Sequence, residues 1–163
     1  MSLLEKYLVD FSSYLIDNEI KLEVIGEIDR LPENVKMLVQ SIRCKVENTN
    51  KTLCLAISYG GRQDIIETCK SVVRLVQKQT ISLDSIDEQT FSRFTSTGRL
   101  GLPDPDLIVR TSGEFRLSNF LLWQCAYAEF VSVDCYWPEY TPEKLQETLH
   151  VYSTRRRRFG AVA

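Results

Sequence analysis

Residues 106–129 read DLIVRTSGEFRLSNFLLWQCAYAE, and this stretch decides the fold. Its apolar start, from Leu107 to Val109, predicts a short buried strand that ends at Arg110, and Glu129 closes the stretch. In open parallel sheets, ligands bind beyond the carboxyl ends of the strands. Arg110 and the residues that follow it are therefore candidates for a binding site.

The turn after Arg110 gathers groups that bind anions. It holds the polar residues Thr111–Gly113 and a second arginine, Arg116, and Ser118 is expected to cap an apolar helix over about 118–127. A helix N-terminus contributes only about 0.3–1 kcal/mol to a nearby anion. Hydrogen bonds that involve a charged group contribute about 1.5–3 kcal/mol, and guanidinium forks match phosphate oxygens. The pattern predicts a phosphate or diphosphate site in which the arginines dominate.

The same spacing allows a plainer interpretation. Glu114 lies between the two arginines and could merely neutralise them in a surface salt-bridge cluster. Such clusters are common and contribute little to stability. From spacing alone, both interpretations stay open.

Strand and helix patterns alternate along the chain. Apolar runs predict strands over 22–25, 53–57, 106–110 and about 130–134. Helical spacing predicts five helices. They lie over about 3–17, from Pro32 onward, after Gly60-Gly61, near 88–95, and from Pro142 to about 157. The inner face of the helix that begins at Pro32 is expected to consist of Val35, Leu38, Ile42 and Val46. This alternation predicts an α/β fold with a mostly parallel sheet flanked by helices, in a single domain over 1–163.

Composition narrows the class of protein. The chain has 163 residues, of which 44% are hydrophobic and 26% charged, as in ordinary globular proteins. A net charge of −2 argues against a nucleic-acid binder. The five cysteines form no C-x-x-C pair, which predicts free thiols in a reducing compartment. With no apolar run near the ~20 residues of a membrane span and no signal-peptide pattern, we expect a cytoplasmic protein.

Several ordered motifs carry a resemblance to a known family. They are LEVIG at 22–26 with RLP at 30–32, LCLAISYGGR at 53–62, the 106–129 stretch, WP at 137–138 and RRFG at 157–160. Together they resemble the cis-prenyltransferases, the family of undecaprenyl and dehydrodolichyl diphosphate synthases. Ordered motifs at family-like spacing are far more specific than any one of them.

The resemblance implies a reaction and a site. The reaction is the condensation of isopentenyl diphosphate with an allylic diphosphate, assisted by Mg²⁺. The resemblance also implies a homodimer. Its lipid product could bring the protein to a membrane surface, which in a eukaryote would be that of the endoplasmic reticulum. The implied roles are metal binding for Glu129 and diphosphate binding for Arg110, Glu114, Arg116, Ser118 and, across the dimer, Arg158.

Three of these features have plainer alternatives. Glu129 could be a half-exposed glutamate at a helix end, and the other arginines of the run 155–158 a solvated surface. The apolar stripe of the first helix could line the family's tunnel for the growing isoprenoid chain or could face an ordinary core. Its members are Leu4, Leu8, Phe11 and Leu15, with Tyr7 and Tyr14 alongside.

The sequence also departs from the family. The pattern His-x-x-Met-Asp-Gly-Asn-x-Arg, whose aspartate binds the metal, does not occur in the 163 residues, nor does Phe-Ser-x-Glu-Asn. We therefore assign no catalytic residue and expect a sheet incomplete at the N-terminus, open to self-association, and a chain that is inactive alone. The first hypothesis is the C-terminal part of a catalytic cis-prenyltransferase. The alternatives are a non-catalytic partner subunit and a simple phosphate-binding module.

Overall fold

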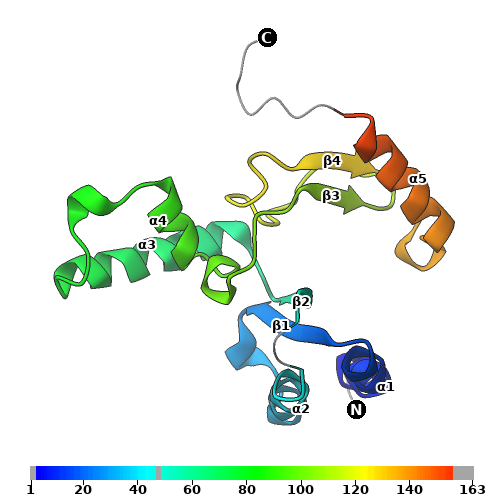
Figure 1. The fold of residues 1–163 in the computed structure, drawn as a ribbon, viewed down its shortest axis with the longest axis horizontal. Helices are drawn as coiled ribbons and strands as arrows, with labels where there is room; N and C mark the ends of the chain where they lie inside the picture. The colour runs from blue at the N-terminus through cyan, green and yellow to red at the C-terminus, as the bar shows by residue number, and fades with distance from the viewer. Residues whose placement is uncertain (1–2, 47–48, 156–163) are drawn as a thin grey trace. The chain divides into compact units, whose positions relative to one another are not determined.

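The computed structural model describes residues 3–46 and 49–155, which form two compact units. Unit 1 runs from Met1 to Asp64 and unit 2 from Ile65 to Ala163. Each unit holds one pair of parallel strands together with helices (Figure 1). The expected α/β class with parallel strands is confirmed, while the single domain over 1–163 stays a prediction.

Unit 1 alternates helices and strands as the sequence predicts. Its elements are α1 (Leu3–Asp17), β1 (Ile20–Gly26), the short 3₁₀ helix η1 (Ile28–Arg30), α2 (Glu33–Arg43) and β2 (Lys51–Ile57). The two strands pair in parallel from Ile20 opposite Lys51 to Gly26 opposite Ile57. Gly26 adopts φ 104°, and a Cβ there would lie 2.1 Å from the Ile57 carbonyl oxygen, so only glycine fits the LEVIG motif's last position.

The core of unit 1 lies where α1 and α2 cover one face of β1 (Figure 1). Of the inner face predicted for the second helix, Val35, Ile42 and Val46 are buried, whereas Leu38 only packs against the core from its margin. The core residues are Leu8, Leu15, Leu22, Val24, Val35, Val39 and Ile42. Helical and strand periodicity therefore located this core well.

The apolar stripe of α1 divides between two faces of the helix. Leu8 and Leu15 are buried in the core. Tyr7, Phe11 and Tyr14 are more than half exposed, and the Tyr7 and Phe11 rings lie 6.5 Å apart between centroids. Core packing therefore explains the two leucines, whereas it does not explain the exposed aromatic side chains.

One carboxylate of β1 is buried where the sequence predicts only apolar packing. The Glu23 side chain is 2% exposed and forms ion pairs with Lys21, at 2.9 Å, and with Arg43 of α2, at 2.8 Å. A buried charge is tolerated when it is paired. The Arg43 pair joins the end of α2 to the middle of β1, whereas Lys21 belongs to β1 itself.

β2 is only partly buried in unit 1. The side chains from Lys51 to Leu53 are exposed, Leu53 by 40%. Its continuous apolar run resembles a strand of a fully covered parallel sheet. Within unit 1, however, β1 takes the buried position and β2 remains at the margin.

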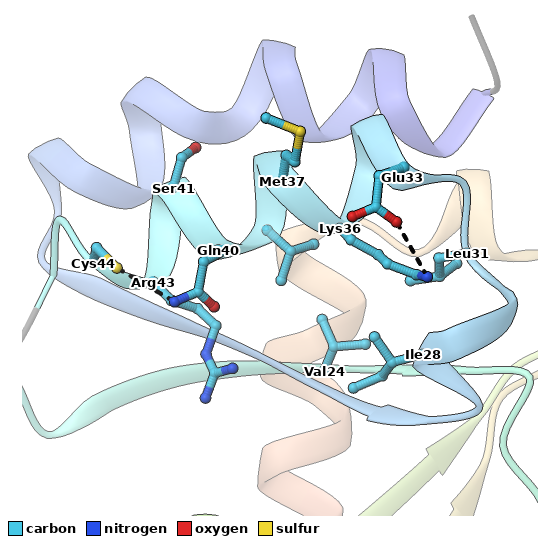
Figure 2. A pocket seen from close by; sticks show the side chains of 11 residues that line it. Val24, Ile28, Leu31, Glu33, Lys36, Met37, Gln40, Ser41, Arg43 and Cys44 are labelled. Carbon is cyan, nitrogen blue, oxygen red and sulfur yellow. Dashed lines mark hydrogen bonds and ion pairs between the residues drawn. The ribbon is translucent and has the colours of Figure 1, made fainter.

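A groove opens between α2 and the end of β1 in unit 1 (Figure 2). Its volume is about 540 Å³, and Val24, Ile28 and Met37 give it an apolar lining. Arg43 and Gln40 lie at one end, and the Glu33–Lys36 ion pair at the other (Figure 2). None of the site residues predicted from the sequence lines this groove.

Unit 2 carries the remaining elements. They are most of α3 (Gly61–Gln77), then η2 (Leu83–Ser85), α4 (Glu88–Phe94), η3 (Gly98–Leu100), β3 (Leu107–Arg110), β4 (Glu129–Ser132), η4 (Trp137–Glu139) and α5 (Pro142–Ser153). β3 and β4 pair in parallel, with Leu107 opposite Glu129 and Arg110 opposite Ser132. The predicted site residues therefore belong to unit 2.

The core of unit 1 gives a direct stability prediction. Leu22→Ala removes a fully buried side chain, and it should lower the free energy of unfolding of this unit by about 2–5 kcal/mol. Met37→Ala, at a position 67% exposed on α2, is the matched control and should change it by less than about 0.5 kcal/mol. Urea titration followed by circular dichroism measures both. Equal effects of the two substitutions would contradict this core.

Candidate functional site

The candidate site begins at the carboxyl ends of β3 and β4. Because Arg110 lies opposite Ser132 in a parallel pair, the two strand ends are neighbours. Backbone hydrogen bonds fold the connection back onto them, from Ser112 N to the Cys135 carbonyl at 2.6 Å and from Gly113 N to the Val133 carbonyl at 3.0 Å. The predicted polar turn after Arg110 therefore lies at this edge.

The helix expected over 118–127 does not form, and Ser118 is not a helix N-cap. The segment consists of turns. Ser118, Asn119 and Leu121 have φ values of 48°, 64° and 44°, in the left-handed region. Three such residues within four positions interrupt a right-handed helix, because a left-handed residue other than glycine costs about 1–2 kcal/mol.

Packing against α4 and η3 holds this irregular segment. The Trp123 indole nitrogen donates to the Ser92 hydroxyl at 2.8 Å, and the Trp123 and Phe91 ring centroids are 4.4 Å apart. Gln124, which is 2% exposed, donates from its amide nitrogen to the Thr97 hydroxyl at 3.2 Å. These side-chain contacts hold the segment in place, together with backbone bonds such as that from Cys125 N to the Leu121 carbonyl at 2.9 Å.

Arg110 holds the middle of the loop. Its Nη1 donates to the Ser118 hydroxyl at 2.8 Å and to the carbonyl oxygen of Arg116. The Ser132 hydroxyl donates to the Glu114 carbonyl at 3.1 Å and so ties the loop to the end of β4 as well. We call these contacts of the Arg110 guanidinium with Ser118 and Arg116 the Arg110 clamp.

The second arginine of the motif is paired with the acid between the two. Arg116 forms an ion pair with Glu114, and the two side chains are 61% and 35% exposed. The ion pair agrees with the plainer interpretation for Glu114 and Arg116, whereas the diphosphate site stays a prediction. Glu114 neutralises Arg116, whereas the Arg110 guanidinium makes its described contacts with a hydroxyl and a carbonyl.

An apolar cavity lies beside Arg116. Its volume is about 270 Å³, and Ile108, Phe115, Cys125 and Phe130 are among its lining residues. The Phe115 and Phe130 rings meet edge to face, with centroids 4.8 Å apart. Burial, and to a smaller extent the charge of Asp104, raise the pKa of the Cys125 thiol to about 11.

Glu129 lies in a strand and not at a helix end. It is the first residue of β4, and its Oε2 accepts a hydrogen bond from Arg155 Nη1 at 2.9 Å. In residues 3–46 and 49–155, no group of three His, Cys, Asp or Glu side chains could hold a metal ion. A Mg²⁺ ion commonly takes one carboxylate together with substrate phosphate oxygens and water, so the metal role of Glu129 stays a prediction.

One arginine of the run 155–158 that was interpreted as solvated surface makes a contact in the structure. Arg155, taken as surface, pairs with Glu129. Arg158 lies outside the described residues. In unit 1, the Tyr59 hydroxyl of the YGGR motif donates to an oxygen of Asp64 at 2.8 Å, at the start of α3.

The comparisons with known proteins agree with this chain's motifs and fold. The model of the family described as putative undecaprenyl diphosphate synthase matches residues 1–160. The chain belongs to this family, the cis-prenyltransferases.

Relatives and a solved structure extend the match. The chain is 42% identical to the ditrans,polycis-undecaprenyl-diphosphate synthase of Micrococcus luteus, covering 99% of the chain and 65% of that protein. It is 41% identical to dehydrodolichyl diphosphate synthase 3 of Arabidopsis thaliana, covering 98% of the chain and 53% of that protein. The crystal structure of lavandulyl diphosphate synthase from Lavandula x intermedia, in complex with dimethylallyl diphosphate, superposes with a TM-score of 0.91 at 33% identity, over 97% of this chain and 68% of that one.

Two further findings bear on the expectations from composition. All five cysteines are free, as predicted. Among the described residues, no helix is long and apolar enough to cross a membrane.

The environment of Cys125 predicts its reactivity. At pH 8 only about one thiol in a thousand is ionised when the pKa is about 11, and the thiolate is the reactive form. Iodoacetamide should therefore modify Cys125 at least about tenfold more slowly than the exposed Cys69, with the rate rising as the pH approaches 11. Peptide mass spectrometry after timed labelling measures both rates. Equal rates at pH 8 would show that the cavity beside Arg116 is open to solvent.

Proposed function

We propose that this protein is a cis-prenyltransferase that condenses isopentenyl diphosphate with an allylic diphosphate. We further propose that the chain supplies the diphosphate site for isopentenyl diphosphate through Arg110, Arg116 and Ser118. The observation that carries the proposal is the Arg110 clamp at the carboxyl ends of two parallel strands. Membership of the family supports the reaction type. Since the chain spans 65% of the Micrococcus luteus relative, the activity of the whole protein is part of the proposal.

We infer that side chains, rather than the first amides of the turn, bind the anion. The amides of Ser112 and Gly113 already donate to carbonyl oxygens beyond β4. No helix begins at Ser118, so a helix dipole contributes nothing there. Guanidinium groups donate in a fork that matches two phosphate oxygens. Arg110 and Arg116 therefore provide most of the attraction.

The clamp also sets the geometry before a substrate arrives. Ser118 and the Arg116 carbonyl hold the Arg110 guanidinium in one orientation. A side chain that is already ordered loses less conformational entropy on binding. In the proposed reaction, such fixed contacts hold the isopentenyl group so that its double bond meets the allylic carbon, and this positioning provides much of the rate enhancement.

Glu114 has a supporting role in this proposal. Its carboxylate repels a diphosphate, so it does not bind one directly. It pairs with Arg116 and keeps that flexible side chain near the clamp. When the diphosphate binds, Arg116 exchanges the carboxylate for phosphate oxygens.

Magnesium would stabilise the departing pyrophosphate, as bound divalent ions do for phosphoryl oxygens. Such an ion takes oxygen ligands from substrate and water as readily as from protein. The exposed aromatic face of α1, with Tyr7, Phe11 and Tyr14, is our candidate for contact with the growing isoprenoid chain.

A binding experiment tests the diphosphate site without requiring turnover. Isothermal titration of the chain with isopentenyl diphosphate should show Arg110→Ala weakening binding about 10–100-fold, since each lost charged hydrogen bond costs about 1.5–3 kcal/mol. Ser118→Ala should weaken it about 3–10-fold, because it removes one neutral partner of the clamp. Arg110→Lys keeps the positive charge but loses the forked donor geometry. Its affinity for isopentenyl diphosphate should lie between those of the wild type and Arg110→Ala.

The matched control is Arg74→Ala, which removes an exposed arginine of α3 away from the strand ends. Its affinity should equal that of the wild type, and circular dichroism checks that each variant is folded. The proposal fails if the wild type does not bind isopentenyl diphosphate. It also fails if Arg110→Ala, still folded, binds as tightly as Arg74→Ala.

A further inference from the structure

The turn that follows α4 is built around two buried hydroxyl groups, those of Thr95 and Thr97. The two residues are 1% and 8% exposed, and their Oγ1 atoms lie 3.3 Å apart. Thr95 Oγ1 donates to the Ser92 carbonyl at 2.8 Å and accepts from Gly98 N at 3.1 Å. Only glycine fits at Gly98, because a Cβ there would lie 1.9 Å from the same carbonyl oxygen. The turn is therefore closely packed, and its hydroxyl groups have fixed positions.

The number of protons in this turn fixes the direction of its hydrogen bonds. A hydroxyl group has one proton to donate, and Thr95 donates it to the Ser92 carbonyl. The Thr97 hydroxyl is therefore the donor toward Thr95, and its own oxygen accepts from Gln124 Nε2 at 3.2 Å. Gln124 is only 2% exposed. Removal of the Thr97 hydroxyl would take an acceptor from a buried amide, which is unfavourable.

Gln124 belongs to the irregular segment that begins at the Arg110 clamp. Ser118, Asn119 and Leu121 of this segment have positive φ values. Left-handed conformations of residues other than glycine persist only where the surrounding structure holds them. The segment is held at one end by Arg110 and at the other by the turn after α4. Loss of either contact lets the strained backbone between them relax.

We propose that Thr97 and Gln124 are positioning residues for the diphosphate site. While Thr97 accepts from Gln124, the segment keeps its left-handed turns, and the Ser118 hydroxyl stays 2.8 Å from the Arg110 guanidinium. The inference rests on the proposed binding of isopentenyl diphosphate by Arg110. Both positioning residues act through the orientation of that guanidinium. Thr97 lies outside every motif of the sequence, so only the fold brings it to this role.

Substitutions of similar shape separate positioning from general stabilisation. Thr97→Val keeps the branched side chain but removes the hydroxyl, and it should weaken binding of isopentenyl diphosphate about 3–10-fold in isothermal titration. Thr97→Ser keeps the hydroxyl and should restore the affinity to within about twofold of the wild type.

Thr68→Val is the matched control. Thr68 is fully buried, and its hydroxyl donates to the Phe94 carbonyl at 3.2 Å and not to the loop. The substitution should lower the midpoint of thermal unfolding, as Thr97→Val does, while the affinity for isopentenyl diphosphate stays that of the wild type. A residue that only stabilised the unit would not separate these two measurements.

Two further measurements test the link between Thr97 and the clamp. The double variant Thr97→Val/Ser118→Ala should bind more tightly than the product of the two single effects, because both substitutions release the same segment. Amide hydrogen exchange needs no substrate. In residues 116–121 it should be about tenfold or more faster in Thr97→Val than in the wild type, and unchanged in Thr97→Ser and Thr68→Val.

The proposal is overturned if exchange in residues 116–121 does not respond to Thr97→Val. It is also overturned if Thr68→Val weakens binding as much as Thr97→Val, or if the effects of Thr97→Val and Ser118→Ala multiply fully. A wild type that binds no isopentenyl diphosphate contradicts the proposed function instead. The exchange measurement then decides by itself whether Thr97 positions the loop.

Discussion

The contact on which the site depends is the one between the Arg110 guanidinium and the loop that follows it. Arg110 reaches the carbonyl of Arg116 and the hydroxyl of Ser118, and so closes a loop that has no helix of its own. Trp123 and Gln124 hold the far part of the loop against α4 and η3. Because Arg110 ends a strand, its position is set by the sheet, and the loop inherits that position. A cationic group is thereby fixed at the edge where parallel sheets bind ligands.

The charged residues of this strand pair differ between its two ends. At the carboxyl end, Arg110 and Arg116 bring positive charge and Ser118 brings a hydroxyl. At the amino end, Glu129 is matched by Arg155, so the charge there is already balanced. The charged residues that the sequence places in one motif are therefore divided between the two ends of the strand pair.

The spacing of apolar residues predicted the regular helices and strands of the chain. The helices α1, α2 and α3 and the buried run of β1 follow from apolar spacing. The conformation of the segment after Ser118 did not follow from apolar spacing. Its apolar composition suits a helix, but Ser118, Asn119 and Leu121 adopt left-handed conformations. Asparagine tolerates the left-handed conformation, so the Ser118-Asn119 pair was the one sequence feature that could have indicated an interrupted helix.

Long-range ion pairs were beyond what the sequence could reveal. Glu23 is buried because Arg43, twenty residues later, reaches it from α2, and nothing in the strand pattern indicates that partner. The Glu129–Arg155 pair spans 26 positions in the same way. Resemblance to the family identified the residues of the loop, whereas only the three-dimensional arrangement separates their roles.

A crystal structure of the chain with isopentenyl diphosphate tests the central claim most directly. We expect diphosphate oxygens within hydrogen-bond distance of the Arg110 and Arg116 guanidiniums and the Ser118 hydroxyl, with Arg116 turned away from Glu114. Diphosphate bound at another place, with the Arg116–Glu114 pair intact and no contact to Arg110, would contradict it.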